Sequence, residues 1–286
     1  MARPGPCDAP QELIDEIIDH CSGDKGTLIA CSLTSRAWVH RTRKYLFSTL
    51  TLTDKTLPVW GGTVAAPTIS KSVPLPSTYP LHLSSNVTSL QLVPKYSRRS
   101  QGTIGVKELL RAKPHLSTFT NLKSLALTCI SFLKFSDGSL KACFGPFAKV
   151  VSELKLSACP LDEERFFTIL RLFTRLESLE VDGIPWHHST SAERKDLPTP
   201  RGSFTASGFV VGGLLKSLAT TKVEYHTITL GWNPPSTLFR FNALLAKCKD
   251  HLKTLSLTAP EWGASSVGNW LLPYHQLDWT DGILSS

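Results

Sequence analysis

Apolar side chains recur along this chain in two different rhythms. Between residues 8 and 48 they recur every three or four positions, which predicts three short amphipathic helices. After residue 48, a second pattern places apolar residues at the first, fourth and sixth positions of a six-residue phrase, with mostly Ser, Thr, Glu and Lys between them. Such alternation predicts half-buried strands with one face in water. The central apolar residues of these phrases are Leu50, Leu90, Leu125, Leu154, Leu179, Ile228 and Leu255.

The opening segment carries its own start signals. Asp8 is a predicted helix cap, and Pro10 suits the first turn, where a missing N–H costs nothing. Asp24 is expected to cap a second helix, and Thr34 or Ser35 a third. Because roughly forty residues bury too little apolar surface to be stable alone, we expect something else to complete the apolar face of these helices.

Helical stretches alternate with the predicted strands in the remainder of the chain. The expected helices span residues 106–113, 161–173, 209–219 and 237–249. The central apolar residues of successive strands are 40, 35, 29, 25, 49 and 27 positions apart. Alternation at this spacing predicts a mixed α/β fold, an irregular leucine-rich solenoid over residues 49–286. The longest steps contain polar segments at 54–86 and 184–206, which we expect to be long loops.

Composition bounds the protein further. The chain has 286 residues, 41% of them apolar, and a net charge of +8 from scattered basic residues. Those residues lack the interleaved aromatic side chains of a nucleic-acid surface, so no nucleic-acid partner is expected. Seven cysteines without a Cys-x-x-Cys pair favour free thiols in the cytoplasm or nucleus. No signal peptide and no run of 18 apolar residues is found, so no membrane span is expected.

We find no catalytic constellation. Gly212-Gly213 and Lys216-Ser217 resemble part of a phosphate loop, but the glycine before the lysine is missing, so a helix is expected there. His187 and His188 are adjacent, and on an extended segment their side chains point apart. The sequence therefore predicts no enzyme, no metal site and no cofactor.

Residues 8–48 resemble an F-box, and their sequence is most similar to the large F-box families of mushroom-forming fungi. The matching positions are Ala9-Pro10, Glu12-Leu13, Ile17, Leu28, Cys31-Ser32-Leu33 and Arg36-Ala37-Trp38. The resemblance implies docking on the Skp adaptor of cullin–RING ubiquitin ligases. The implied contact residues are Pro10, Leu13, Ile17, Leu28, Cys31 and Trp38. The alternative is that these residues pack on the C-terminal region of the same chain.

Two departures from the family pattern reduce apolar surface. Ala9 and Cys21 stand where leucine is usual, which would weaken docking by about 1–2 kcal/mol per lost leucine contact. This keeps a second hypothesis open, a leucine-rich scaffold that does not engage a ligase. Residues 49–286 loosely resemble the leucine-rich domains that commonly follow F-boxes, with Cys129 and Cys159 placed after their strands as in such repeats.

The resemblance predicts a substrate receptor with an unidentified protein target. On a leucine-rich sheet the solvent face is the usual target surface, and its candidate residues here are Gln91, Lys155, Glu180 and Asp182. Trp186, Trp232 and Trp262 follow strands, either as interface anchors or as caps on the core. After Leu257 no clear final helix follows, so the tail is atypical or the array continues beyond it.

Overall fold

A computed structural model describes residues 10–53, 84–94, 106–187, 201–207, 211–231 and 238–258. Three helices come first, α1 (Gln11–His20), α2 (Lys25–Thr34) and α3 (Arg36–Leu46). The strands are β1 (Thr49–Thr53), β2 (Ser89–Val93), β3 (Ser124–Thr128), β4 (Glu153–Ser157), β5 (Leu161–Asp162), β6 (Ser178–Asp182), β7 (Trp186–His187), β8 (Arg201–Ser207), β9 (Glu224–Gly231) and β10 (Thr254–Thr258). The later helices are α5 (Val106–Leu116), α6 (Asp137–Ala148), α7 (Glu163–Leu172), α8 (Val211–Ala219) and α9 (Leu238–Cys248), with a 3-10 turn at Phe132–Lys134.

The three N-terminal helices form a small unit of their own. Asp24 caps α2 by accepting hydrogen bonds from Gly26 N and Thr27 N at 2.9 and 3.2 Å, as the sequence predicted. Ser35 caps α3 by accepting from Ala37 N. Asp8, the predicted cap of α1, lies outside the described residues. The core of this unit is formed by Ile14, Ile18 and Leu28, against which Cys21, Trp38, Tyr45 and Leu46 pack.

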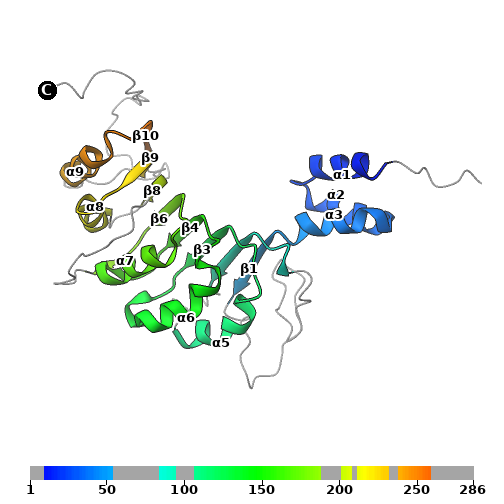
Figure 1. The fold of residues 1–286 in the computed structure, drawn as a ribbon, viewed down its shortest axis with the longest axis horizontal. Coiled ribbons are helices and arrows are strands. Elements are labelled where there is room, and N and C mark those ends of the chain that lie inside the picture. The colour runs from blue at the N-terminus through cyan, green and yellow to red at the C-terminus, as the bar shows by residue number, and fades with distance from the viewer. Residues whose placement is uncertain are drawn as a thin grey trace, which may run out of the picture.

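Eight parallel strands form the sheet that dominates the molecule (Figure 1). Their order is β1-β2-β3-β4-β6-β8-β9-β10, which follows the chain, so each strand pairs with the next sheet strand in sequence. The register places the central apolar residues in one row across the sheet, Leu50, Leu90, Leu125, Leu154, Leu179, Phe204, Ile228 and Leu255. The predicted mixed α/β fold is therefore confirmed.

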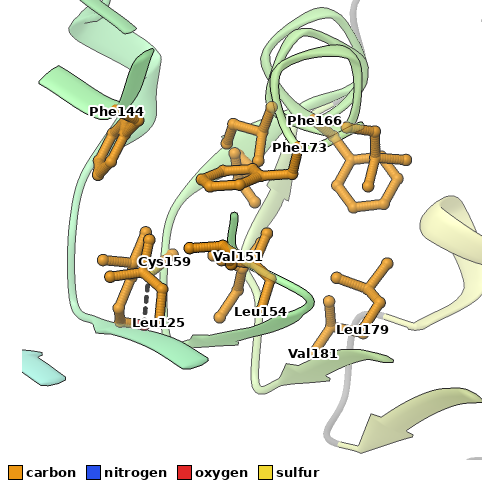
Figure 2. Packing of buried hydrophobic residues seen from close by; sticks show 14 of the residues in the cluster. Leu125, Phe144, Val151, Leu154, Cys159, Phe166, Phe173, Leu179 and Val181 are labelled. Carbon is orange, nitrogen blue, oxygen red and sulfur yellow. Dashed lines mark hydrogen bonds between the residues drawn. The ribbon is translucent and has the colours of Figure 1, made fainter. Parts of the chain in front are cut away.

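The helices α5 to α9 line one face of this sheet, and the main core lies between (Figure 1). Figure 2 shows Leu125, Leu154 and Leu179 of neighbouring strands pointing toward Phe144, Phe166 and Phe173 of the helical layer. Along β2, β3, β4 and β6, buried residues alternate with half-buried or exposed ones. This alternation is the half-buried strand pattern that the sequence predicted.

Three successive strands end in the same turn. Cys129, Ala158 and Gly183 each follow a strand with a φ of 52, 50 and 55°, in the left-handed region. Their backbone N–H groups donate to the last carbonyl of the neighbouring strand, in Ser157, Asp182 and Ser207, at 2.8 to 3.0 Å. The repeated turn directs the chain away from the sheet in the same way each time.

Beside the second of these turns, the thiol of Cys159 is fully buried, donates to the carbonyl of Leu127 at 3.3 Å and accepts from the N–H of Ile130 at 3.4 Å. This thiol therefore bonds to backbone groups on both sides of the preceding turn, at Leu127 and Ile130.

The expected loop at residues 184–206 was wrong in part, because residues 201–207 form β8 between β6 and β9. Phe204 and Ala206 fill the two buried positions of this strand, but Arg201 stands where the six-residue phrase has an apolar residue. The 49-residue step between Leu179 and Ile228 is thereby divided at Phe204 into 25 and 24. The other expected loop lies outside the described residues from 54 to 83.

Candidate functional site

Several aliphatic side chains of the small helical unit are exposed to solvent. Leu13 and Ile17 lie one turn apart on α1 and are 53% and 51% exposed. Ile29 and Leu33 stand at the same spacing on α2, with exposed fractions of 52% and 81%. Residues four apart share a helix face, so each helix presents an apolar pair to solvent. These four residues are the aliphatic surface of the helical unit.

The predicted adaptor-contacting residues divide between surface and interior. Pro10, Leu13 and Ile17 are exposed, as docking residues must be. Leu28 is fully buried and Cys31 is 8% exposed in the chain alone, so neither adds to the exposed surface, and their predicted contact with an adaptor stays a prediction. Leu28 belongs to the small core with Ile14 and Ile18, and so helps to hold the helices together.

Trp38 is half-buried and packs against the small core, which leaves only part of its ring for a partner. Ile29 and Leu33 were not predicted from the sequence to contact a partner. Leu33 could have been predicted, because it belongs to the F-box motif Cys31-Ser32-Leu33. Cys21 packs against the small core as well, so the missing leucine at this position reduces interior packing more than it reduces the exposed surface.

A polar cluster joins α1 to α3. Asp19 pairs with the Arg41 guanidinium, whose Nε donates to Asp19 Oδ1 at 2.6 Å, and the Tyr45 hydroxyl donates to the same oxygen at 2.7 Å. The hydrogen bond from Arg41, followed by that from Tyr45, lowers the pKa of Asp19 to about 2. The carboxylate is therefore charged at neutral pH and fixes the orientation of α1, on which Leu13 and Ile17 stand.

The predicted target-binding residues share the solvent face of the sheet. Gln91, Lys155 and Glu180 occupy one cross-strand row, and Asp182 lies in the next row. Lys155 Nζ lies 2.5 Å from Glu180 Oε1, and Asp182 accepts a hydrogen bond from Ser207 at 2.6 Å. Gln91 accepts from the Thr51 hydroxyl at 3.3 Å. Each of these polar groups is already paired within the sheet, so the row offers a largely neutralised surface.

Within the described ranges, no cluster of three or more His, Cys, Asp or Glu side chains could hold a metal ion. Burial raises the pKa of the Cys159 thiol to about 12 and that of Cys143 to about 11, so neither is a nucleophile at neutral pH. No described helix is long and apolar enough to cross a membrane. The side chains of Trp186 and His187 and all of His188, Trp232 and Trp262 lie outside what the structure describes.

The sequence was compared with models of known protein families and with curated proteins. It matches no family model. No curated protein matches it either. Any functional assignment therefore depends on the chemistry of this chain's own residues, above all on the aliphatic surface of the helical unit.

Proposed function

We propose that this chain is an F-box substrate receptor, which docks on the Skp adaptor of a cullin–RING ubiquitin ligase through α1–α3. The observation that carries the proposal is the aliphatic surface of the helical unit, formed by Leu13, Ile17, Ile29 and Leu33. Leu13, Ile17 and Leu33 occupy positions of the F-box wording in the sequence. A protein surface that keeps four aliphatic side chains at least half exposed on a unit this small is typical of an interaction site.

Burial of this surface would supply part of the docking energy. The four exposed fractions together equal about 2.4 fully exposed side chains, so covering them contributes roughly 4–7 kcal/mol, at about 1.5–3 kcal/mol for each side chain. A micromolar complex needs about 8 kcal/mol, so other contacts must add to this contribution. The ion pair between Asp19 and Arg41 joins α1 to α3, and a surface pair of this kind contributes about 0–1 kcal/mol to holding α1 in place.

The sheet supplies the second half of the proposed function. We propose that it is an irregular leucine-rich-repeat-like solenoid, a reading supported by its sequential parallel strands and by the repeated turn at Cys129, Ala158 and Gly183. The solenoid would present a protein target near the conjugating enzyme of the ligase. Ubiquitin transfer then depends on proximity, because a held target lysine has a raised effective concentration.

A scaffold that engages no ligase is the second candidate. Cys21 favours the scaffold, because cysteine is smaller than the leucine that is usual at this position of an F-box. The smaller side chain weakens the core against which α1 packs. The two candidates differ in one measurable property, the affinity of the chain for the Skp adaptor.

The test is a pull-down of the full chain with purified Skp adaptor at micromolar concentrations. The wild-type chain is expected to bind, and Leu13→Asp is expected to reduce binding at least tenfold. The matched control is Leu257→Asp on β10, because Leu257 is 52% exposed and Leu13 is 53% exposed. Absence of binding by the wild-type chain, or equal losses in the two variants, would refute the receptor assignment.

A further inference from the structure

A polar hollow opens at the amino-terminal edge of the sheet, where α3 runs into β1. Its volume is about 740 Å3. Three cations line it: Lys44 from α3, Lys123 before β3 and Arg175 before β6. Glu177 is the one carboxylate among the described residues of the lining, so the charged side chains sum to +2. The other described lining residues are six with hydroxyl or amide side chains and one apolar residue, Val150.

The sheet holds the floor of this hollow in a regular arrangement. Glu153 N donates to the carbonyl of Lys123 at 3.0 Å, and Ser178 N donates to the carbonyl of Ser152 at 2.9 Å. Lys123 and Glu177 therefore occupy equivalent positions two strands apart, which is about 10 Å at the usual strand spacing. The side-chain amide of Asn121 donates to the carbonyl of Ser85 at 2.8 Å and ties two neighbouring connections together.

The charges in the hollow are available to a ligand. Lys123 and Arg175 are exposed, and neither takes part in an ion pair within 4.0 Å among the residues that the structure describes. The described lining contains no aromatic ring on which a nucleobase could stack, which argues against single-stranded nucleic acid. A wall of hydroxyls and amides suits a peptide backbone, since it can both donate and accept hydrogen bonds.

We propose that this hollow binds an acidic segment of a partner protein. Its carboxylates pair with Lys123 and with the planar guanidinium of Arg175, which can hold a carboxylate through two parallel hydrogen bonds. Its backbone bonds to the surrounding hydroxyl and amide groups. That this partner is the ligase target rests on the proposed receptor function. Binding of the acidic segment itself does not require the adaptor.

The test uses the full chain and fluorescein-labelled degenerate peptides, one library rich in Asp and Glu and a second with Asn and Gln in their place. Fluorescence anisotropy is expected to show at least tenfold tighter binding of the acidic library. The double variant Lys123→Ala/Arg175→Ala is expected to remove that preference. Glu177→Gln is expected to strengthen acidic binding about two- to fivefold, because a nearby like charge is lost.

A charge-matched control separates this site from general attraction by a basic protein. Lys141→Ala/Arg171→Ala removes one exposed lysine from α6 and one exposed arginine from α7, and it lowers the net charge from +8 to +6 as the first pair does. The control is expected to bind acidic peptides within twofold of the wild type. Equal losses in both double variants, or tighter binding of a single-stranded oligonucleotide than of the acidic library, would overturn the proposal.

Adaptor binding is measured on the same preparations. Lys123→Ala/Arg175→Ala is expected to leave it unchanged, so a failure at the hollow and a failure of the receptor assignment give different results.

Discussion

The helical unit and the sheet bury their apolar side chains to very different extents. The sheet and its covering helices share a large core with fully buried aromatic residues such as Phe144, Phe166 and Phe204. The helical unit has three buried aliphatic residues at its centre. Of the seven large apolar side chains exposed in the described ranges, four belong to α1 and α2. The difference shows that most apolar side chains of the sheet region lie in a shared core, whereas the helices leave a larger part of theirs exposed.

The same substitution, leucine to alanine, is expected to have very different effects on stability in the two regions. Leu154→Ala is expected to lower the free energy of unfolding by about 2–5 kcal/mol, because Leu154 is 1% exposed and a cavity would remain. Leu33→Ala is expected to change it by less than about 0.5 kcal/mol, because Leu33 already lies in water. Urea denaturation measures both values. Similar losses in the two variants would mean that α2 packs against the chain in a way that the structure does not show.

Adding a single β carbon at a crowded position of the sheet is also expected to lower stability. Gly202 has a φ of 83° and a β carbon there would lie 1.9 Å from the carbonyl oxygen of Glu177. Gly202→Ala is therefore expected to cost about 1–3 kcal/mol of stability or more. Gly138→Ala is the control, because a β carbon at the start of α6 meets only Ser136 Oγ at 3.9 Å. Thermal unfolding of the control should match or slightly exceed the wild type, and an unaffected Gly202→Ala variant would contradict the proposed strain.

The smallest expected effect concerns the ion pair of the helical unit. Hydrogen bonds from Arg41 and Tyr45 lower the pKa of Asp19 from 3.8 to about 2. Because the folded pKa lies below the unfolded one, the stabilisation is fully present above about pH 4 and is lost as the pH falls through about 2. Carbon-13 NMR titration of the Asp19 carboxyl should give a midpoint near 2 that rises toward 3.8 in Arg41→Ala. Arg43→Ala is the control on the same helix, and a wild-type midpoint near 3.8 would contradict the geometry.

The sequence alone was sufficient to predict those features that depend on interactions between residues close together in the chain. The caps at Asp24 and Ser35 were predicted and are confirmed, since each cap bonds to an N–H within three residues. The helices α7, α8 and α9 were predicted for a similar reason, because apolar spacing along a helix is visible in a short window.

Long-range contacts explain what the sequence did not predict. The helix α6 was missed because Gly138, Gly145 and Pro146 lower its intrinsic helix propensity. Gly145 lacks the β carbon that would crowd Pro146, and the buried side chains of Phe144 and Phe147 stabilise the helix through the core.

The inward face of α2 was not predictable either. Apolar residues surround this helix, so spacing alone could not tell that Leu28 faces the core and Ile29 faces water. Two of the six residues predicted to contact the adaptor, Leu28 and Cys31, are buried in the chain alone, and the docking surface itself stays a prediction.

Amide hydrogen exchange with and without the Skp adaptor can show whether α1 and α2 form the docking surface. For the chain alone, the account predicts weaker protection in α1 and α2 than in β3, β4 and β6, because the helical unit has the smaller core. Addition of the adaptor should raise protection in α1 and α2 and leave those strands unchanged. Helices that are already as protected as the sheet, and that the adaptor leaves unaltered, would contradict the account.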